Sequence, residues 1–127
     1  MKPASFPSSS SPLQIRVKLG PTKAFGPGKA ELLERIASSG SISAAARGMR
    51  MSYKRAWQLV DDMNGSFRSP LVMTAAGGNQ GGGAVLTAAG RTVLASYRAL
   101  QGSMDASARL ELATLTRLAR RKTATSR

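Results

Sequence analysis

Apolar and polar positions alternate near the start of the chain. Four apolar residues are separated by single polar residues from Leu13 to Leu19, which predicts one half-buried strand over 13–19. A lone strand leaves its edges unpaired, so it must pair with a later segment or with a second subunit. The preceding residues 1–12 are rich in serine and proline and predict a disordered arm, because this composition cannot form a packed core.

After a loop over 20–28 that is rich in proline and glycine, the pattern changes to helical spacing. Helices are predicted over 29–38, from a capping Ser41 or Ser43 to about Arg50, and from a capping Ser52 to about Met63 or Asn64. Gly40 is suited to the C-terminal cap of the first helix, because glycine accepts a positive φ. The apolar stripe of that helix is expected to consist of Leu32, Leu33, Ile36 and Ala37.

The C-terminal half predicts a hairpin and one long helix. Short strands over 70–75 and 84–86 enclose a loop, 76–83, in which five of eight residues are glycine. Thr87 is expected to cap a helix over 88–119, in which Gly90 and Gly102 would weaken or kink the chain. Its apolar residues recur at spacings of three and four and comprise Val93, Tyr97, Leu100, Met104, Ala108, Leu112, Leu115 and Leu118.

This order of elements predicts an α+β domain, mostly α, of the winged helix-turn-helix type. We expect the domain over 13–119, with an N-terminal strand, a glycine-rich two-stranded wing and a basic flexible tail over 120–127. The apolar positions of the long helix, 88–119, continue beyond the length that so small a domain can cover. This excess favours a homodimer that pairs through the C-terminal helix.

The amino-acid composition excludes several classes of function. The 127 residues include 19 Lys and Arg against 6 Asp and Glu, a net charge of +13, and no histidine or cysteine. Disulfides, the usual zinc sites and imidazole-dependent catalysis are therefore excluded, and we expect neither an enzyme nor a cofactor or metal site. No apolar run approaches the roughly 20 residues of a spanning helix, so we expect no membrane partner and a cytoplasmic location. The charge favours a polyanionic partner, double-stranded DNA.

The third helix is the predicted recognition helix. Tyr53, Ala56, Trp57, Val60 and Met63 share one face and are expected to pack inward, while Lys54, Arg55 and Gln58 project from the other side. We expect Arg55 and Gln58 to contact bases, because arginine pairs with guanine and glutamine with adenine. Lys54, Arg47 and Arg50 are expected to contact phosphates. The predicted DNA-binding set is Ser41, Ser43, Arg47, Arg50, Ser52, Tyr53, Lys54, Arg55, Gln58, Gly78, Asn79 and Gln80.

Two plainer interpretations remain open for these segments. The basic face of the helix pair is also compatible with a merely solvated surface. The glycine-rich loop is not a P-loop, because no Lys-Ser/Thr follows it. It is equally compatible with a wing tip that approaches the duplex and with an ordinary hairpin loop.

Three motifs carry a family resemblance. They are Gly40–Ala46 (GSISAAA), Met51–Trp57 (MSYKRAW) continuing to Asp62-Met63-Asn64, and Pro70-Leu71-Val72 followed by the glycine loop, Ala84–Thr87 and Gly90. From about Leu13 to Leu100 the chain resembles the N-terminal DNA-binding domain of the ModE family of molybdate-responsive transcription regulators. The second motif together with the glycine wing is the most specific part.

The resemblance implies a dimeric repressor or activator with a LysR-like helix-turn-helix, which docks the helix over about 52–64 and the wing over about 70–86 on operator DNA. Similar wings often hold a basic residue where this chain has Asn79-Gln80, which implies a weaker wing–phosphate attraction. ModE-type regulators sense molybdate with C-terminal domains. We expect no such domain after residue 119, and hence no molybdate or tungstate cofactor.

Two alternatives to a specific regulator remain. One is an architectural, weakly specific DNA-binding protein. The other is a protein-interaction module whose basic face is incidental and whose long helix docks a partner.

Overall fold

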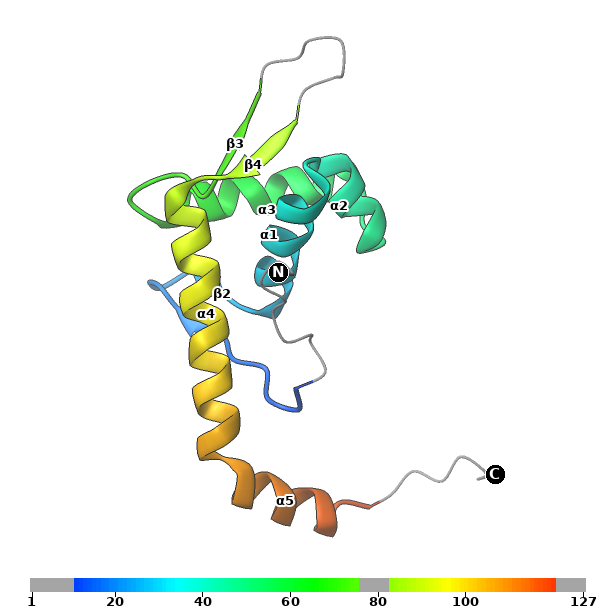
Figure 1. Ribbon diagram of the computed structural model, residues 1–127, viewed down its shortest axis with the longest axis vertical. Coiled ribbons are helices and arrows are strands. Elements are labelled where there is room, and N and C mark those ends of the chain that lie inside the picture. The colour runs from blue at the N-terminus through cyan, green and yellow to red at the C-terminus, as the bar shows by residue number, and fades with distance from the viewer. Residues whose placement is uncertain (1–10, 76–82, 121–127) are drawn as a thin grey trace, which may run out of the picture.

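The computed structural model describes residues 11–75 and 83–120. The elements are β1 (Val17–Lys18), β2 (Ala24–Phe25), α1 (Pro27–Ser39), α2 (Ile42–Gly48), α3 (Tyr53–Ser66), β3 (Val72–Thr74), β4 (Ala84–Leu86), α4 (Ala88–Ser107) and α5 (Arg109–Leu118). Helices α1 to α3 gather beneath the β3–β4 hairpin, α4 descends beside them, and α5 turns away at the lower end (Figure 1). The predicted mostly helical α+β architecture, with a helix pair and a two-stranded hairpin, is confirmed.

The core lies where α1 meets α2, α3, α4 and the hairpin. Leu32, Leu33 and Ile36 of α1 are fully buried at its centre, as the helical spacing predicts. Ala37, the fourth predicted member of this stripe, is exposed, so that prediction is wrong. The remaining large apolar side chains that are buried among the described residues are Phe25, Ile42, Val60, Met63, Leu71, Val72, Leu86, Leu94 and Tyr97.

The predicted N-terminal strand is much shorter than its alternating pattern. Only Val17 and Lys18 pair, antiparallel with Phe25 and Ala24, and this partner strand lies inside the segment predicted as a loop. Side chains nevertheless alternate between half-buried and exposed from Ser11 to Lys18. The alternating pattern therefore reports the packing of side chains. Backbone groups outside the two-residue pairing form hydrogen bonds with groups other than a neighbouring strand.

Side chains of α4 supply those partners. The Tyr97 hydroxyl donates to the carbonyl oxygen of Ile15, and Gln101 Nε2 donates to the carbonyl oxygen of Leu13 at 3.4 Å. Burial raises the pKa of the Tyr97 phenol above its usual value, and the nearby charge of Arg98 offsets only part of this effect. Residues 1–10 of the predicted arm lie outside the described residues, and Ser11 Oγ donates to Asp105 Oδ1 at 2.7 Å. The N-terminal segment is thus attached along α4.

A buried ion pair joins α4 to α1. Arg98 Nε donates to Glu34 Oε2 at 2.7 Å, and its NH1 donates to Gln101 Oε1 at 2.8 Å. The side chain of Arg98 is only 5% exposed. A buried cation must be paired and hydrogen-bonded to be tolerated, and both conditions hold here.

The start of α4 lies against the residue that precedes β3. Thr87 Oγ1 accepts from the backbone N–H of Gly90 at 2.9 Å, which confirms Thr87 as the cap. A Cβ on Gly90 would stand 2.2 Å from the carbonyl oxygen of Leu71. Only glycine therefore allows this close approach.

The prediction of a single long helix over 88–119 is wrong, because the helix is interrupted at Ala108, between α4 and α5. Gly90 and Gly102, the predicted weak points, both lie inside α4. At the break, the Ala108 N–H donates to Met104 and the Ala108 carbonyl accepts from Leu112, at 2.9 and 2.8 Å. Hydrogen bonds of the i to i−4 type thus cross the break, so the apolar spacing continues through it and cannot reveal it.

Candidate DNA interface

The helix pair α2 and α3 is built by two serine caps. Ser41 Oγ accepts from the N–H of Ala44 at 3.0 Å, and Ser52 Oγ accepts from the N–H of Arg55 at 2.9 Å. Between Ser41 and Ser43, the two candidates for the cap of α2, the structure selects Ser41. Each capping hydroxyl keeps its own O–H as a donor, since the cap uses only a lone pair.

The inward face of α3 agrees with the predicted periodicity except at its first residue. Ala56, Val60 and Met63 are buried, and Trp57 packs against the core. Tyr53 is 55% exposed, so its predicted inward position is wrong. It stands in the first turn, beyond the edge of the core, and its ring meets that of Trp57 edge-on at 6.2 Å between centroids.

The outward face of α3 brings three predicted residues together. Lys54, Arg55 and Gln58 are all exposed. Gln58 lies four residues after Lys54 and three residues after Arg55. Residues at these spacings are neighbours on a helix surface. Within residues 11–75 and 83–120, neither Lys54 nor Arg55 forms an ion pair, so both charges face solvent.

The other basic residues predicted for the site lie on α2 and in the turn after it. Ser43 and Arg47 are exposed on α2, and Arg47 NH1 donates to Ser43 Oγ at 3.1 Å. Helix α2 ends at Gly48 rather than near Arg50. Arg50 has a φ of 58°, a left-handed conformation uncommon for a non-glycine residue, and its side chain is exposed.

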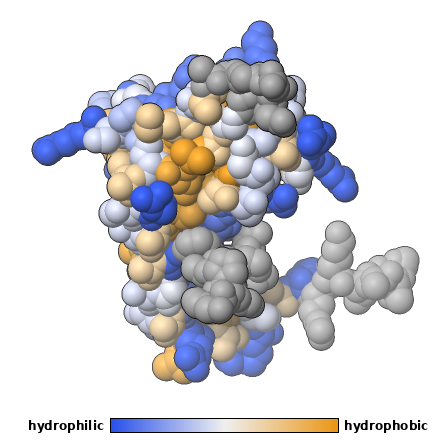
Figure 2. Space-filling model, turned by 45° about the horizontal axis from the view of Figure 1, so that its top comes forward, coloured by the Kyte–Doolittle hydropathy of each residue, from blue (hydrophilic) through white to orange (hydrophobic). Residues whose placement is uncertain are grey.

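The β3–β4 hairpin extends above the helices (Figure 1) and pairs Val72 with Leu86, Met73 with Val85 and Thr74 with Ala84. The predicted contact residues of the wing tip, Gly78, Asn79 and Gln80, lie outside the described residues. Figure 2 shows hydrophilic side chains projecting from both sides of the upper part of the molecule, where Figure 1 places the helix pair and hairpin.

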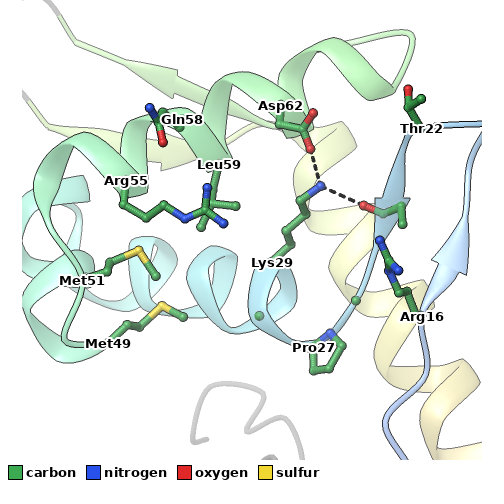
Figure 3. A pocket seen from close by; sticks show the side chains of 13 residues that line it. Arg16, Thr22, Pro27, Lys29, Met49, Met51, Arg55, Gln58, Leu59 and Asp62 are labelled. Atoms are coloured by element: carbon green, nitrogen blue, oxygen red, sulfur yellow. Dashed lines mark hydrogen bonds and ion pairs between the residues drawn. The ribbon is translucent and has the colours of Figure 1, made fainter.

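A groove runs along the side of α3 that faces β1, β2 and the start of α1 (Figure 3). Its volume is about 740 Å³, and Arg55 and Gln58 form part of its wall. Facing them are Arg16, which precedes β1, and Lys29 of α1. Neither residue is among the predicted contact residues, because both are far from the helix pair in sequence and no motif marks them.

Lys29 is held in place at this groove. Its Nζ donates to Asp62 Oδ2 of α3 and, at 2.8 Å, to the carbonyl oxygen of Ala24. The predicted start of α1 at Lys29 is wrong by two residues, because the helix begins at Pro27 with Gly26 as its N-cap. Proline is favoured in the first turn, where its missing N–H would be unpaired anyway.

Comparison with known families agrees with this geometry. A family model described as the bacterial regulatory helix-turn-helix protein, lysR family, matches residues 28–91, which is half of the chain. The chain belongs to the LysR family of bacterial regulatory helix-turn-helix proteins. This match spans α1, the helix pair, the hairpin and the start of α4. A LysR-type helix-turn-helix is a DNA-binding domain, and the family is one of regulatory, non-enzymatic proteins.

Curated relatives place this LysR-type domain close to ModE regulators. The molybdenum transport protein ModE of Azotobacter vinelandii is 51% identical over 70 residues, which are 55% of this chain and 26% of that protein. The molybdenum-pterin-binding protein MopB of Rhodobacter capsulatus is 47% identical over 80 residues, 63% of this chain and 30% of MopB. The DNA-binding transcriptional dual regulator ModE of Escherichia coli K12 is 45% identical over 71 residues, 56% of this chain and 27% of that protein.

The chain therefore spans between about a quarter and a third of the length of these relatives. It carries a ModE-like, LysR-type helix-turn-helix domain, as the sequence motifs predict. Among the described residues, no helix combines the length and apolar character needed to cross a membrane.

Proposed function

We propose that the chain is a sequence-specific transcription regulator that binds operator DNA as a homodimer, with α3 in the major groove. The exposed polar face of α3 carries this proposal. One side of the helix is sealed into the core through Ala56, Val60 and Met63, while the opposite side presents two cations and an amide to solvent. A helix fixed in this way can enter the groove without rearrangement of the fold.

The roles of the outward residues follow from their chemistry. Arg55 and Gln58 offer the two side chains that pair bidentately with guanine and adenine, each worth about 1–3 kcal/mol of discrimination. Lys54 lies beside them as a point charge for a phosphate. Tyr53, exposed at the helix start, adds a hydroxyl donor and acceptor at the same end.

Residues of α2 and the following turn would hold the adjacent backbone. Arg47 and Arg50 supply cations, and the O–H groups of Ser41, Ser43 and Ser52 can donate to phosphate oxygens. Such contacts fix the register of the protein on the duplex but carry no sequence information directly. Together with α3 they would form one continuous DNA-contacting surface.

The β3–β4 hairpin would act as the wing. Asn64 near the end of α3 bonds to the backbone of Leu71 and Val72, so the base of the hairpin has a defined position relative to the recognition helix. Gly78, Asn79 and Gln80 would then reach the neighbouring backbone or minor groove. Their lack of charge implies a weaker contribution than that of the helix pair.

Dimerisation is proposed through α5 and the lower part of α4. The exposed fractions of Leu110, Leu115 and Leu118 are 77%, 65% and 72%. Leu100 and Met104 continue this apolar surface along α4, and apolar side chains are visible among hydrophilic ones at the lower end in Figure 2. Pairing of two copies would cover these side chains and present two recognition helices to one operator.

A weakly specific architectural protein is the second candidate, and the net charge of +13 favours it. Phosphate attraction alone would then dominate binding, with a steep dependence on salt and little preference among sequences. The two candidates differ in how much more tightly a preferred duplex binds than a random one. A specific binder exceeds its own non-specific affinity by about 10³ or more.

Selection of bound fragments from genomic DNA tests the proposal. We expect an enriched site with two-fold symmetry, whose half-sites lie one or more helical turns apart. Enrichment without a shared sequence would instead favour the architectural candidate. If no duplex binds in a salt-sensitive manner, the chain is an interaction module and the proposal is wrong.

A further inference from the structure

The groove beside α3 gathers cations from three separate elements. Arg16 comes from the segment before β1, Lys29 from α1 and Arg55 from α3, and Figure 3 shows their side chains extending toward the same space. Asp62 is the acidic residue that lines it, and its carboxylate is paired with Lys29. Like charges brought together in this way favour an anion between them.

Two of these cations keep donors available. A lysine ammonium has three N–H donors, and Lys29 uses two of them for Asp62 and Ala24. Arg16 is exposed and forms no ion pair within the described residues. Its guanidinium is a planar group suited to bidentate contact with phosphate oxygens. Met49, Met51 and Leu59 also line the groove, on the side of Arg55, so an oxyanion would bind at the end formed by Arg16 and Lys29.

The position of the groove indicates where that oxyanion comes from. Helix α3 lies between two hairpins (Figure 1). On one side Asn64 bonds to the backbone at the base of β3–β4. On the other side Asp62 pairs with Lys29, and Lys23 Nζ, from the β1–β2 turn, donates to the carbonyl oxygen of Gly65 at 3.2 Å. The exposed face with Gln58 at its centre lies between these two flanks.

We propose that the groove holds a backbone phosphate of the DNA strand opposite the wing, with Arg16 and Lys29 as the residues that bind it. The major groove is about 12 Å wide, so a helix inside it has one phosphate backbone on each side. The wing approaches one backbone, and the Arg16 groove receives the other. Arg55, at the edge of the same groove, remains available for bases. This inference rests on the proposed placement of α3 in DNA and adds a contact outside the helix pair.

The test compares Arg16→Gln with Arg120→Gln, which removes the same charge from an exposed residue beyond the end of α5. We expect Arg16→Gln to weaken binding to selected and random duplexes by a similar factor, about three- to tenfold, because a phosphate contact carries no sequence information. The slope of log affinity against log salt should become shallower by about 0.9, the value for one lost phosphate contact. Unchanged thermal melting would show that the variant is folded.

A duplex series with single neutral methylphosphonates locates the contact. The parent should lose affinity when one flanking phosphate is neutralised, and Arg16→Gln should be insensitive to that same substitution. If Arg16→Gln matches Arg120→Gln in affinity and salt slope, the inference is wrong while the proposed function stands. If the parent binds no duplex at all, the proposed function itself fails.

Inorganic phosphate, added at constant ionic strength, separates the two sources of an oxyanion. The Arg16 and Arg55 guanidinium resonances report on occupancy of the groove. Saturation by free phosphate, combined with DNA affinity that Arg16→Gln leaves at the control value, would assign the groove to a free anion and overturn the inference. The inference is supported if free phosphate competes weakly with DNA for the parent, and if Arg16→Gln loses both this competition and part of its DNA affinity.

Discussion

Asn64 makes two hydrogen bonds with the backbone of Val72. Its Nδ2 donates to the Val72 carbonyl oxygen at 3.1 Å, and its Oδ1 accepts from the Val72 N–H at 3.1 Å. The same oxygen accepts from the N–H of Leu71 at 2.8 Å. One side chain of α3 therefore replaces a strand as the hydrogen-bonding partner for the base of the hairpin.

Replacement of this side chain should loosen the hairpin. Asn64→Ala leaves the N–H groups of two buried residues without their partner, so we expect the free energy of unfolding to fall by about 1–3 kcal/mol. Urea denaturation measures the loss. Asn64→Asp is the control, because it keeps the accepting oxygens and should cost less than alanine. Equal losses for the two variants would contradict the role assigned to Oδ1.

The buried pair of Arg98 and Glu34 predicts a larger effect. Arg98→Met leaves the Glu34 carboxylate without its cation in a largely buried position, and we expect a loss of about 3–5 kcal/mol in the free energy of unfolding. Arg35→Met is the matched control. It breaks the pair between Arg35 and Glu31, which is much more accessible to solvent, and pairs at the surface contribute at most about 1 kcal/mol. If both variants lose a similar amount of stability, the deeper burial of the Arg98–Glu34 pair does not make it more important than the Arg35–Glu31 pair.

Two glycines of α4 should respond to alanine with opposite signs. Gly90→Ala places a Cβ 2.2 Å from the carbonyl oxygen of Leu71, so the melting temperature should fall, with a cost of about 1–3 kcal/mol. Among the described atoms, nothing lies within 4 Å of a Cβ on Gly102. Gly102→Ala should therefore raise the stability by about 0.5–1 kcal/mol through helix propensity. A tolerated alanine at position 90 would show that α4 can shift away from Leu71.

These contacts explain which features the sequence could predict. Helical spacing located α1 and α3, and serine and glycine located their caps, because both signals depend only on residues a few positions apart. The bounds of β4 agree with the predicted 84–86, whereas β3 is shorter than the predicted 70–75, because it pairs only from Val72 to Thr74. The core of α3 was predicted correctly from Ala56 to Met63, and Tyr53 failed because periodicity cannot report where the core ends.

Contacts between residues far apart in the chain could not be predicted from the sequence pattern. The alternation from Leu13 onward identified half-buried side chains, but the capture of the Ile15 and Leu13 carbonyls by Tyr97 and Gln101 depends on residues more than 80 positions away. The pairing of Lys29 with Asp62 depends on the packing of α1 against α3 in the same way. The position of Arg16 at the groove that Arg55 also lines depends on how the N-terminal segment packs. The residues predicted for the interface therefore lie on the helix pair and the wing, and the flank proposed to hold a phosphate had no local sequence signal.

The apolar surface of α5 predicts a dimer that can be dissociated. A variant with serine at positions 110, 115 and 118 should sediment as a monomer at concentrations where the parent is a dimer, because it removes the apolar area that the partner would cover. Met73→Ser combined with Val85→Ser is the control, since these two exposed side chains lie on the hairpin. A parent that sediments as a monomer would contradict the proposed homodimer.

The central proposal is that α3 reads DNA sequence, and paired affinities for a selected and a random duplex test it most directly. We expect Arg55→Ala to lose about 1–3 kcal/mol on the selected duplex and much less on the random one. Lys54→Ala should weaken both by a similar factor, because it removes a phosphate contact. This contrast between neighbouring residues of one helix is the result that the proposal predicts. If both variants bind both duplexes as the parent does, α3 is not the recognition helix.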